Sequence, residues 1–142
     1  MILKFKKLTD FANVPSRSRI GDAALDIASC ESVSIKPRST FLIHTGITIE
    51  IQDGYCGLVL PRSGNAVNHG ITIINSPGLI DANYRGEIMI GLHNTSNDVF
   101  NVSQGDRIAQ LLIVPVVDVD VQVVDSLSNS NRGTQGFGSS GR

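Results

Sequence analysis

Alternating apolar and polar residues recur along the chain, with a period typical of half-buried β-strands. Residues 43–51 predict one such strand, whose buried face consists of Ile43, Ile47, Ile49 and Ile51. Residues 87–93 and 117–123 show the same period, the second with valines at alternate positions. Residues 108–116 are almost continuously apolar, which indicates a strand covered on both faces or buried against another subunit.

A single short helix is expected among these strands. It covers residues 63–69, with Ser63 as its amino-terminal cap and Gly70 directly after its last residue. Glycine and proline separate the other segments, as at Asp53-Gly54. Many short strands with turns between them predict an all-β protein with a jelly-roll-like sandwich or barrel.

The end of the chain differs in character from the rest. Residues 125–142 contain four glycines and five serines, with Leu127 and Phe137 as their only large apolar side chains. Such a segment buries too little apolar surface to offset the entropy lost on ordering. We therefore expect a β domain over residues 1–124 and a flexible tail over residues 125–142. Arg132, Phe137 and the small residues around them would suit an anion clamp with a stacking lid.

Length and charge narrow the functional classes. The chain has 142 residues, which suits one domain, and its net charge of −1 argues against a strongly basic nucleic-acid binder. Cys30 and Cys56 lie in no C-x-x-C pair, so free thiols are expected. The sequence shows neither a signal-peptide pattern nor a membrane-spanning apolar run. These features predict a soluble protein of the cytoplasm, or of an infected host cell if a virus encodes it.

Two segments carry groups that suit phosphate chemistry. Pro-Arg-Ser-Gly at residues 61–64 stands where a predicted strand meets the predicted helix. Its amides, hydroxyl and guanidinium form either a phosphate cradle or an ordinary capped turn. Gly-Asp-Arg-Ile-Ala-Gln at residues 105–110 opens another strand, either as part of a site or as a β-turn with a structural salt bridge.

Two aspartates are candidate functional residues, one because of its apolar surroundings and the other because of the polar residues around it. Asp26 lies in an otherwise apolar run, where a carboxylate is costly unless a cation or a metal lies beside it. Asp81 lies in the polar residues 75–87, which also offer the amide of Asn75 and the ring of Tyr84. There Asp81 is either an ordinary residue of a turn or a general base that orients a water molecule.

Taken together, five short segments resemble, in order and spacing, the five motifs of the homotrimeric deoxyuridine triphosphatases (dUTPases). The resemblance covers nearly the whole chain. The segments are Ala-Leu-Asp-Ile at residues 24–27, Pro-Arg-Ser-Gly at 61–64, residues 75–87, Gly-Asp-Arg-Ile-Ala-Gln at 105–110 and the glycine-rich residues 132–141.

The resemblance implies hydrolysis of dUTP to dUMP and pyrophosphate, which limits uracil incorporation into DNA and supplies dUMP for thymidylate synthesis. Asp81 would activate the water that attacks the α-phosphorus. The nucleoside would be bound by Asn75, Gly78, Leu79, Ile80, Tyr84 and Met89. The triphosphate would be bound by Arg62, Ser63, Gly64 and Gln110.

A metal, a lid and an assembly are also implied by the resemblance. Mg²⁺ would be chelated mainly by the phosphates, with Asp26 acting on it through a bound water. The tail would close over the substrate through Arg132, Phe137, Gly138, Ser139 and Ser140. The protein would be a homotrimer with active sites shared between subunits, with dUTP as its ligand and neither nucleic acid nor membrane as a partner.

Other readings stay open on the sequence. A dCTP deaminase resembles dUTPases in fold and shares parts of the second and third motifs, but it lacks the glycine-rich fifth. A non-catalytic nucleotide-sensing or regulatory protein, or a jelly-roll structural subunit, would share only the scaffold. The chain also departs from the family's usual residues at Ala24, Leu25, Asn65 and Asn83.

Overall fold

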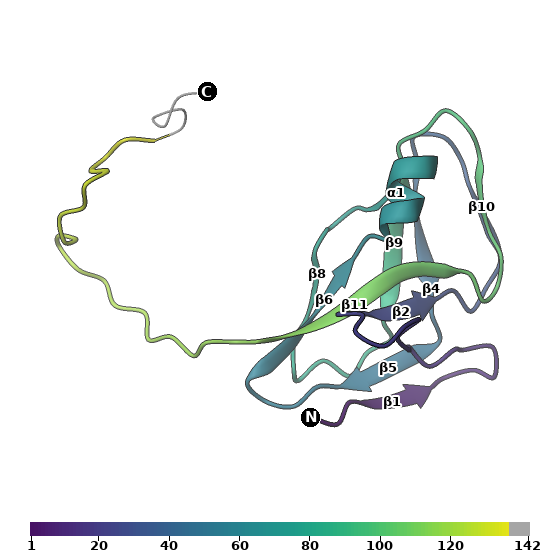
Figure 1. The fold of residues 1–142 in the computed structure, drawn as a ribbon, viewed down its shortest axis with the longest axis horizontal. Helices are drawn as coiled ribbons and strands as arrows, with labels where there is room; N and C mark the ends of the chain where they lie inside the picture. The colour runs from purple at the N-terminus through teal and green to yellow at the C-terminus, as the bar shows by residue number, and fades with distance from the viewer. Residues whose placement is uncertain (137–142) are drawn as a thin grey trace.

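Short antiparallel strands make up most of the fold, as the alternating sequence predicts (Figure 1). The computed structural model describes residues 1–136. The elements are β1 (Lys4–Lys7), β2 (Leu25–Ala28), β3 (Val33–Ile35), β4 (Thr40–His44), β5 (Ile47–Glu50), β6 (Tyr55–Leu60), α1 (Ser63–His69), β7 (Ile71–Ile73), β8 (Gly78–Ile80), β9 (Met89–Asn94), β10 (Phe100–Val102) and β11 (Arg107–Pro115). The expected all-β class is confirmed.

The strands form four small sheets. The largest has the order β2-β11-β6-β8, and each pairing in it is antiparallel. A second sheet has the order β4-β9-β7, and the pairs β1-β5 and β10-β3 complete the set. Because β11 pairs along both of its edges, Gln110 lies opposite Asp26 on one side and opposite Leu60 on the other.

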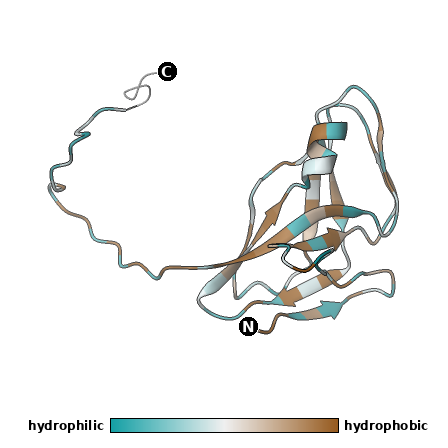
Figure 2. Cartoon of the chain, in the orientation of Figure 1, coloured by the Kyte–Doolittle hydropathy of each residue, from teal (hydrophilic) through white to brown (hydrophobic). Residues whose placement is uncertain are grey.

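Isoleucines from several strands fill the core. Nearly complete burial is found for Ile27, Ile35, Ile43, Ile47, Ile49, Ile71, Ile90 and Ile108. β-branched side chains of this kind pack well on a pleated surface. Figure 2 shows that apolar residues follow β11 and continue into the extended segment after it. Within residues 1–136, each buried side-chain nitrogen or oxygen has a hydrogen-bond partner.

The single strand expected over residues 43–51 is instead two strands in different sheets. β4 pairs with β9, whereas β5 pairs with β1. Gly46 interrupts the segment with a φ of 67°, a left-handed conformation that favours glycine. A Cβ at Gly46 would also lie 2.5 Å from the Cγ2 atom of Thr9. The isoleucines predicted for the buried face are nevertheless all buried, because the break preserves their even spacing.

The prediction of a strand over residues 117–123 is wrong. β11 ends at Pro115, and the chain then leaves the sheets as an extended segment (Figure 1). Val119 is 68% exposed and Val123 is 96% exposed. A strand needs partners for its backbone amides and carbonyls, and no described strand of the same chain pairs with this segment. The apolar run over residues 108–116 does form a strand, β11, as predicted.

The predicted helix is confirmed, but Ser63 is not its cap. Arg62 occupies the cap position with an extended backbone, and Ser63 is the first helical residue. At the other end Gly70 adopts φ 66° and donates its amide to the carbonyl of Ala66. Arg62 therefore stands at the corner where β6 gives way to α1.

The remaining expectations on thiols and membrane spans have clear outcomes. Cys30 and Cys56 are free thiols, as expected. Among the residues that the structure describes, no helix has the length and apolar character that crossing a membrane requires.

Candidate active site

Most of the predicted site residues line two cavities. The larger, of about 630 Å³, is lined by five of them, namely Asp26, Arg62, Ser63, Gly64 and Gln110. The smaller, of about 210 Å³, is lined by six of them, namely Asn75, Gly78, Leu79, Ile80, Tyr84 and Met89. The groups that the sequence analysis assigned to phosphate and to nucleoside therefore gather in separate places.

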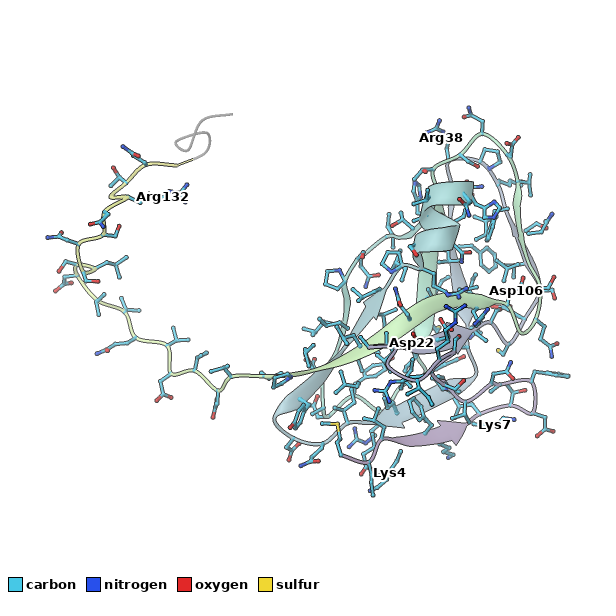
Figure 3. The ribbon with its side chains drawn as sticks, in the orientation of Figure 1. Lys4, Lys7, Asp22, Arg38, Asp106 and Arg132 are labelled. Atoms are coloured by element: carbon cyan, nitrogen blue, oxygen red, sulfur yellow. The ribbon has the colours of Figure 1, made fainter. Side chains whose placement is uncertain are left out.

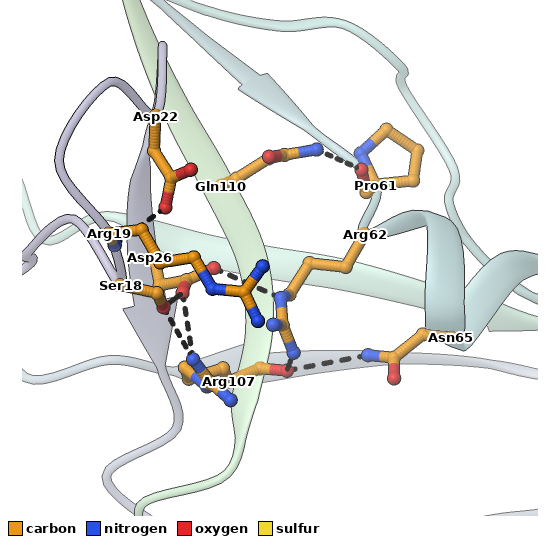
Figure 4. Close-up of polar contacts among 9 residues, drawn as sticks. All are labelled: Ser18, Arg19, Asp22, Asp26, Pro61, Arg62, Asn65, Arg107 and Gln110. Carbon is orange, nitrogen blue, oxygen red and sulfur yellow. Dashed lines mark hydrogen bonds and ion pairs between the residues drawn. The ribbon is translucent and has the colours of Figure 1, made fainter.

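Asp26 lies on β2 in the larger cavity, between two arginines (Figure 4). Its Oδ1 lies 3.0 Å from Nε of Arg62, and its Oδ2 lies 3.1 Å from Nη1 of Arg107. The hydroxyl of Ser18 also donates to Oδ2, at 2.6 Å. The sequence predicted that this carboxylate needs a partner, and two cations and a hydroxyl fill that need.

The ionisation of Asp26 follows from these contacts. Partial burial alone would raise its pKa, because it disfavours the charged carboxylate. The hydrogen bond from Ser18 and the charges of Arg62 and Arg107 outweigh that effect and hold the pKa below its ordinary value of 3.8. Asp26 is therefore a carboxylate at neutral pH.

Hydrogen bonds to the backbone hold the other polar groups of the larger cavity. Arg62 donates from Nη1 to the carbonyl of Arg107 at 3.1 Å, and Asn65 donates to the same carbonyl at 3.4 Å. Gln110 donates from Nε2 to the carbonyl of Pro61 at 2.8 Å. These bonds join β11 to the corner between β6 and α1, so hydrogen bonds within the chain fix the positions of these side chains.

β8 and the loop after it form the wall of the smaller cavity. Tyr84 and Met89 are each 41% exposed there. The hydroxyl of Tyr84 donates to the carbonyl of Glu87 at 2.8 Å. A Cβ at Gly86 would lie 2.5 Å from that hydroxyl, so the ring packs directly on the glycine backbone. β8 is also the last strand of its sheet, which leaves one backbone edge without a strand partner among the described residues.

The two cavities lie on opposite faces of the largest sheet. Leu60 lines the larger cavity and Val59 lines the smaller one, and successive residues of a strand point to opposite faces. The pairing agrees with this, because Gln110 lies opposite Leu60 whereas Gly78 lies opposite Val59. A single chain therefore does not bring the two groups of predicted residues together.

Two described site residues, Asp81 and Arg132, are not among those that line either cavity. Asp81 follows β8 directly, with an exposed side chain, and its carbonyl accepts the amide of Tyr84 at 3.1 Å. Arg132 lies on the extended segment, away from the sheets (Figure 3), and donates to the carbonyls of Gln135 and Gly136. The remaining predicted residues lie outside the described part of the chain, namely Phe137, Gly138, Ser139 and Ser140.

The sequence analysis did not place Arg107 in the site. Counting back from Gln110 in steps of two puts Arg107 on the opposite face of β11. A β-bulge between Arg107 and Ala109 inserts one residue into that count and turns the guanidinium toward Asp26. The β-turn with a structural salt bridge, the alternative considered for residues 105–110, is found as well. Asp106 accepts the amide of Ser103 in a turn, and the salt bridge is the pair of Arg107 with Asp26.

Comparisons with known proteins identify the family. The dUTPase family model matches residues 10–141. The chain belongs to the dUTPase family. A deoxyuridine 5'-triphosphate nucleotidohydrolase of Tropheryma whipplei (strain Twist) is 51% identical over 129 residues, which is 90% of this chain and 88% of the relative.

Solved dUTPase structures share the fold. The dUTPase of Staphylococcus bacteriophage 80alpha with dUPNHPP has a TM-score of 0.92 at 32% identity and covers 99% of both chains. A mutant dUTPase from phage phi11 of S. aureus, described with a structural Mg(II) ion, has a TM-score of 0.83 at 26% identity, over 91% of this chain and 100% of the other. The jelly-roll-like architecture expected from the strand pattern is thereby confirmed for this chain.

Replacing Asp26 should destabilise the protein in a pH-dependent way. Because the pKa of Asp26 is lowered, its contribution is present above its ordinary value of 3.8 and is lost as the pH falls through the folded value. We expect Asp26→Asn to lower the free energy of unfolding by about 1–3 kcal/mol at neutral pH, since it removes one partner of two arginines. Urea unfolding at a series of pH values and fixed protein concentration measures this difference.

Asp22→Asn is the matched control for this experiment. Asp22 lines the same cavity, but its carboxylate accepts only the backbone amide of Arg19 in the described structure, at 2.8 Å. Its substitution should have a smaller effect. A difference between wild type and Asp26→Asn that stays constant down to the most acidic folded conditions would contradict the prediction.

Proposed function

We propose that this dUTPase-family chain hydrolyses dUTP to dUMP and pyrophosphate. The observation that carries the proposal is that the motif residues line two cavities of complementary chemistry. The larger is lined by Arg19, Arg62 and Arg107 and suits a phosphate chain. The smaller, beside an edge of β8 that pairs with no described strand, suits a small polar base. The reaction would limit uracil incorporation into DNA and supply dUMP for thymidylate synthesis.

Uracil and deoxyribose bind at the smaller cavity. The free edge of β8 offers backbone donors and acceptors to the polar edge of uracil, much as a neighbouring strand would. Asn75 supports this edge, because a Cβ at Gly78 would lie 3.4 Å from its Nδ2. At about 210 Å³ the cavity is small, so the extra methyl group of thymine is disfavoured. Tyr84 packs under the deoxyribose and leaves no space for a 2'-hydroxyl.

The triphosphate binds at the larger cavity of a neighbouring subunit. Arg62 offers the planar donors that suit phosphate oxygens, and Gln110 is fixed beside it. Ser63 and Gly64 belong to the first turn of α1, whose amides have no partner within the helix. A Cβ at Gly64 would meet nothing within 4 Å, so the backbone there is open to a ligand.

Mg²⁺ fits this cavity as an ion carried by the phosphates. It prefers oxygen ligands and keeps several of its waters. Oδ1 of Asp26 has one partner, Nε of Arg62, among the contacts of the described residues, so it retains acceptor capacity for a metal-bound water. When bound, Mg²⁺ neutralises charge on the phosphates and on the leaving pyrophosphate.

Asp81 acts as the general base. Its exposed carboxylate at the end of β8 takes a proton from a water molecule, and the water oxygen attacks the α-phosphorus. A bond forms between that oxygen and the α-phosphorus, while the bond to the oxygen bridging toward the β-phosphorus breaks. Pyrophosphate leaves with that bridging oxygen. Arg62 and Gln110 stabilise the charge that develops on the phosphoryl oxygens.

Subunits of a homotrimer share each active site in this proposal. The placement of the two cavities on opposite faces of one sheet supports sharing, because one chain cannot present both to the same dUTP. The outer face of that sheet supports an assembly as well. It carries apolar side chains that remain partly exposed in the single chain, namely Leu58, Leu60, Leu112 and Val114.

The tail closes over the substrate of another subunit. The segment after Pro115 is exposed and extends away from the sheets of its own chain (Figure 1), which gives it the reach to do so. Arg132 would bind the γ-phosphate. The residues assigned to cover uracil and the phosphates lie outside the described part, namely Phe137, Gly138, Ser139 and Ser140. A segment that orders on its ligand suits this composition.

Pyrophosphate release from dUTP, dTTP, dCTP and UTP, each with Mg²⁺ and with EDTA, tests the reaction. We expect Mg²⁺-dependent turnover of dUTP, with kcat/KM for the other nucleotides lower by about 10²-fold or more. Asp81→Asn should lower kcat by about 10²–10⁴-fold while dUTP binding is retained, because the general base is lost but the cavities are not. Asp53→Asn, an exposed aspartate in the turn after β5, is the matched control. Deamination of dCTP, or no reaction with all four nucleotides, would contradict the proposal.

Mixing two inactive variants tests whether sites are shared. Arg62→Ala damages the larger cavity and Asp81→Asn damages the base, so a shared site regains both groups when each comes from a different chain. Random co-refolding in equal amounts should restore about one quarter of wild-type activity. Arg62→Ala mixed with Gln110→Ala is the control, because both changes lie in one cavity and no combination is intact. Recovery in the control, or none in the test mixture, would rule out this arrangement.

Shortening the tail separates its two parts. Truncation after Ser130 should lower kcat/KM by about 10³-fold and leave urea unfolding unchanged, because residues 131–136 are exposed. Truncation after Gly136 keeps Arg132 and removes only the residues assigned to the lid over uracil and the phosphates. We expect it to have an intermediate activity. Wild-type activity in the shorter protein would reduce the tail to a linker.

A further inference from the structure

Glu87 joins the loop of the smaller cavity to a distant part of the sequence. It lies between β8 and β9 and is one of the residues that line this cavity. Its carboxylate contacts the turn between β4 and β5. Oε1 accepts the amide of Gly46 at 2.8 Å, and Oε2 lies 2.9 Å from Nδ1 of His44. The proposed reaction assigns this carboxylate no task.

Further hydrogen bonds join the same two segments. The hydroxyl of Thr48 donates to the carbonyl of Arg85 at 2.8 Å, and the hydroxyl of Thr45 donates to the carbonyl of Ile88. These neutral bonds flank Glu87 on both sides in the sequence. The charged contact from Glu87 therefore sits at the centre of the attachment, where it is partly shielded from water.

Charge favours the contact between Glu87 and His44. Partial burial alone would raise the pKa of Glu87, but hydrogen bonds from His44 and Gly46 outweigh it and the pKa is lowered. The hydrogen bond to Glu87 and its negative charge raise the pKa of His44. Glu31 adds to this environment, because its carboxylate accepts the backbone amide of His44 at 2.8 Å.

The same residue also holds Tyr84. The carbonyl of Glu87 accepts the hydroxyl of Tyr84, and the ring packs on Gly86 between the two residues. Movement of Glu87 would therefore move the acceptor that fixes the ring. The side chain of Glu87 attaches the loop to the β4–β5 turn, and its backbone attaches the ring to the loop.

We propose that Glu87 is a positioning residue that holds the ring of Tyr84 in place and thereby sets the discrimination between deoxyribose and ribose nucleotides. The second half of this inference rests on the proposed function, in which Tyr84 packs under the deoxyribose. A ring held in one position excludes a 2'-hydroxyl by steric conflict, whereas a loop free to shift makes room for it. The larger cavity is left unchanged by this movement, because no residue of this loop lines it.

Selectivity is the first measurement. Glu87→Ala should lower the ratio of kcat/KM for dUTP to kcat/KM for UTP by about tenfold, mainly through KM, with kcat for dUTP within about threefold of wild type. Glu87→Gln keeps an acceptor for the amide of Gly46 and should restore most of the ratio. Asp53→Asn is the matched control, because it removes an exposed carboxylate from the turn after β5. His44→Ala removes one of the two contacts and should lower the ratio by about threefold.

The position of Tyr84 can also be followed without any nucleotide. The chain has two tyrosines and no tryptophan, so Tyr84 is the only emitter of its kind in a Tyr55→Phe background. Glu87→Ala in that background should raise the acrylamide quenching constant of Tyr84 fluorescence by about 1.5-fold or more, because the ring is released. Cooperative urea unfolding of each variant shows that it is folded.

The two measurements separate the possible failures. Unchanged quenching in folded Glu87→Ala and His44→Ala overturns the positioning assignment, whatever the activity. Raised quenching with an unchanged dUTP-to-UTP ratio overturns the link to sugar discrimination. If wild type does not hydrolyse dUTP, the proposed function fails, while raised quenching still supports Glu87 as the residue that positions Tyr84.

Discussion

The pairing of β11 along both of its edges is the constraint on which the larger cavity depends. β2 on one side supplies Asp26, and β6 on the other leads directly into Arg62 and α1. Three segments far apart in the sequence thus meet across one strand, with Gln110 between them. The bulge at Arg107 adds the second cation, because it turns that side chain onto the face that carries Asp26. Without this register Arg107 would lie on the other face of the sheet, and Arg62 would be the one cationic partner left to Asp26.

The two-sided nature of a sheet also limits what one chain can do. Residues that alternate along β6 serve different cavities, so no side-chain movement within the sheet can merge them. A substrate with a base at one end and a phosphate chain at the other could be bound fully only if a second copy supplied the opposite face. The partly exposed leucines on the outer face and the exposed valines after Pro115, which pair with no described strand, have the same explanation in the proposed assembly. Both are costly for a monomer in water and favourable against a neighbour.

Prediction from the sequence succeeded where the local pattern of apolar and polar residues determines the structure. It failed where the structure depends on a second segment, either a pairing strand or a salt-bridge partner. Alternation identified the buried isoleucines of β4, β5 and β9, and the continuous apolar run identified β11. The same alternation at residues 117–123 indicates only that a strand is possible, since a strand requires a second backbone to pair with, and residues 1–136 place none beside this segment. The need of Asp26 for a partner could be read from its neighbours, but Arg107 could not be chosen as that partner because a bulge is invisible to a period of two. The assignments of individual residues to uracil, sugar and phosphates came from motif resemblance, and they stay predictions.

Charge balance in the larger cavity clarifies what Asp26 contributes. Three arginines and two aspartates line it, so its formal charge is only modestly positive. An anion site built for affinity alone would omit the carboxylates. Asp26 instead holds the guanidiniums of Arg62 and Arg107 in fixed positions, which lowers the entropy lost when they bind a ligand. A phosphate chain that arrives with its own Mg²⁺ carries less net charge, so geometry rather than excess positive charge is what such a ligand requires of the protein.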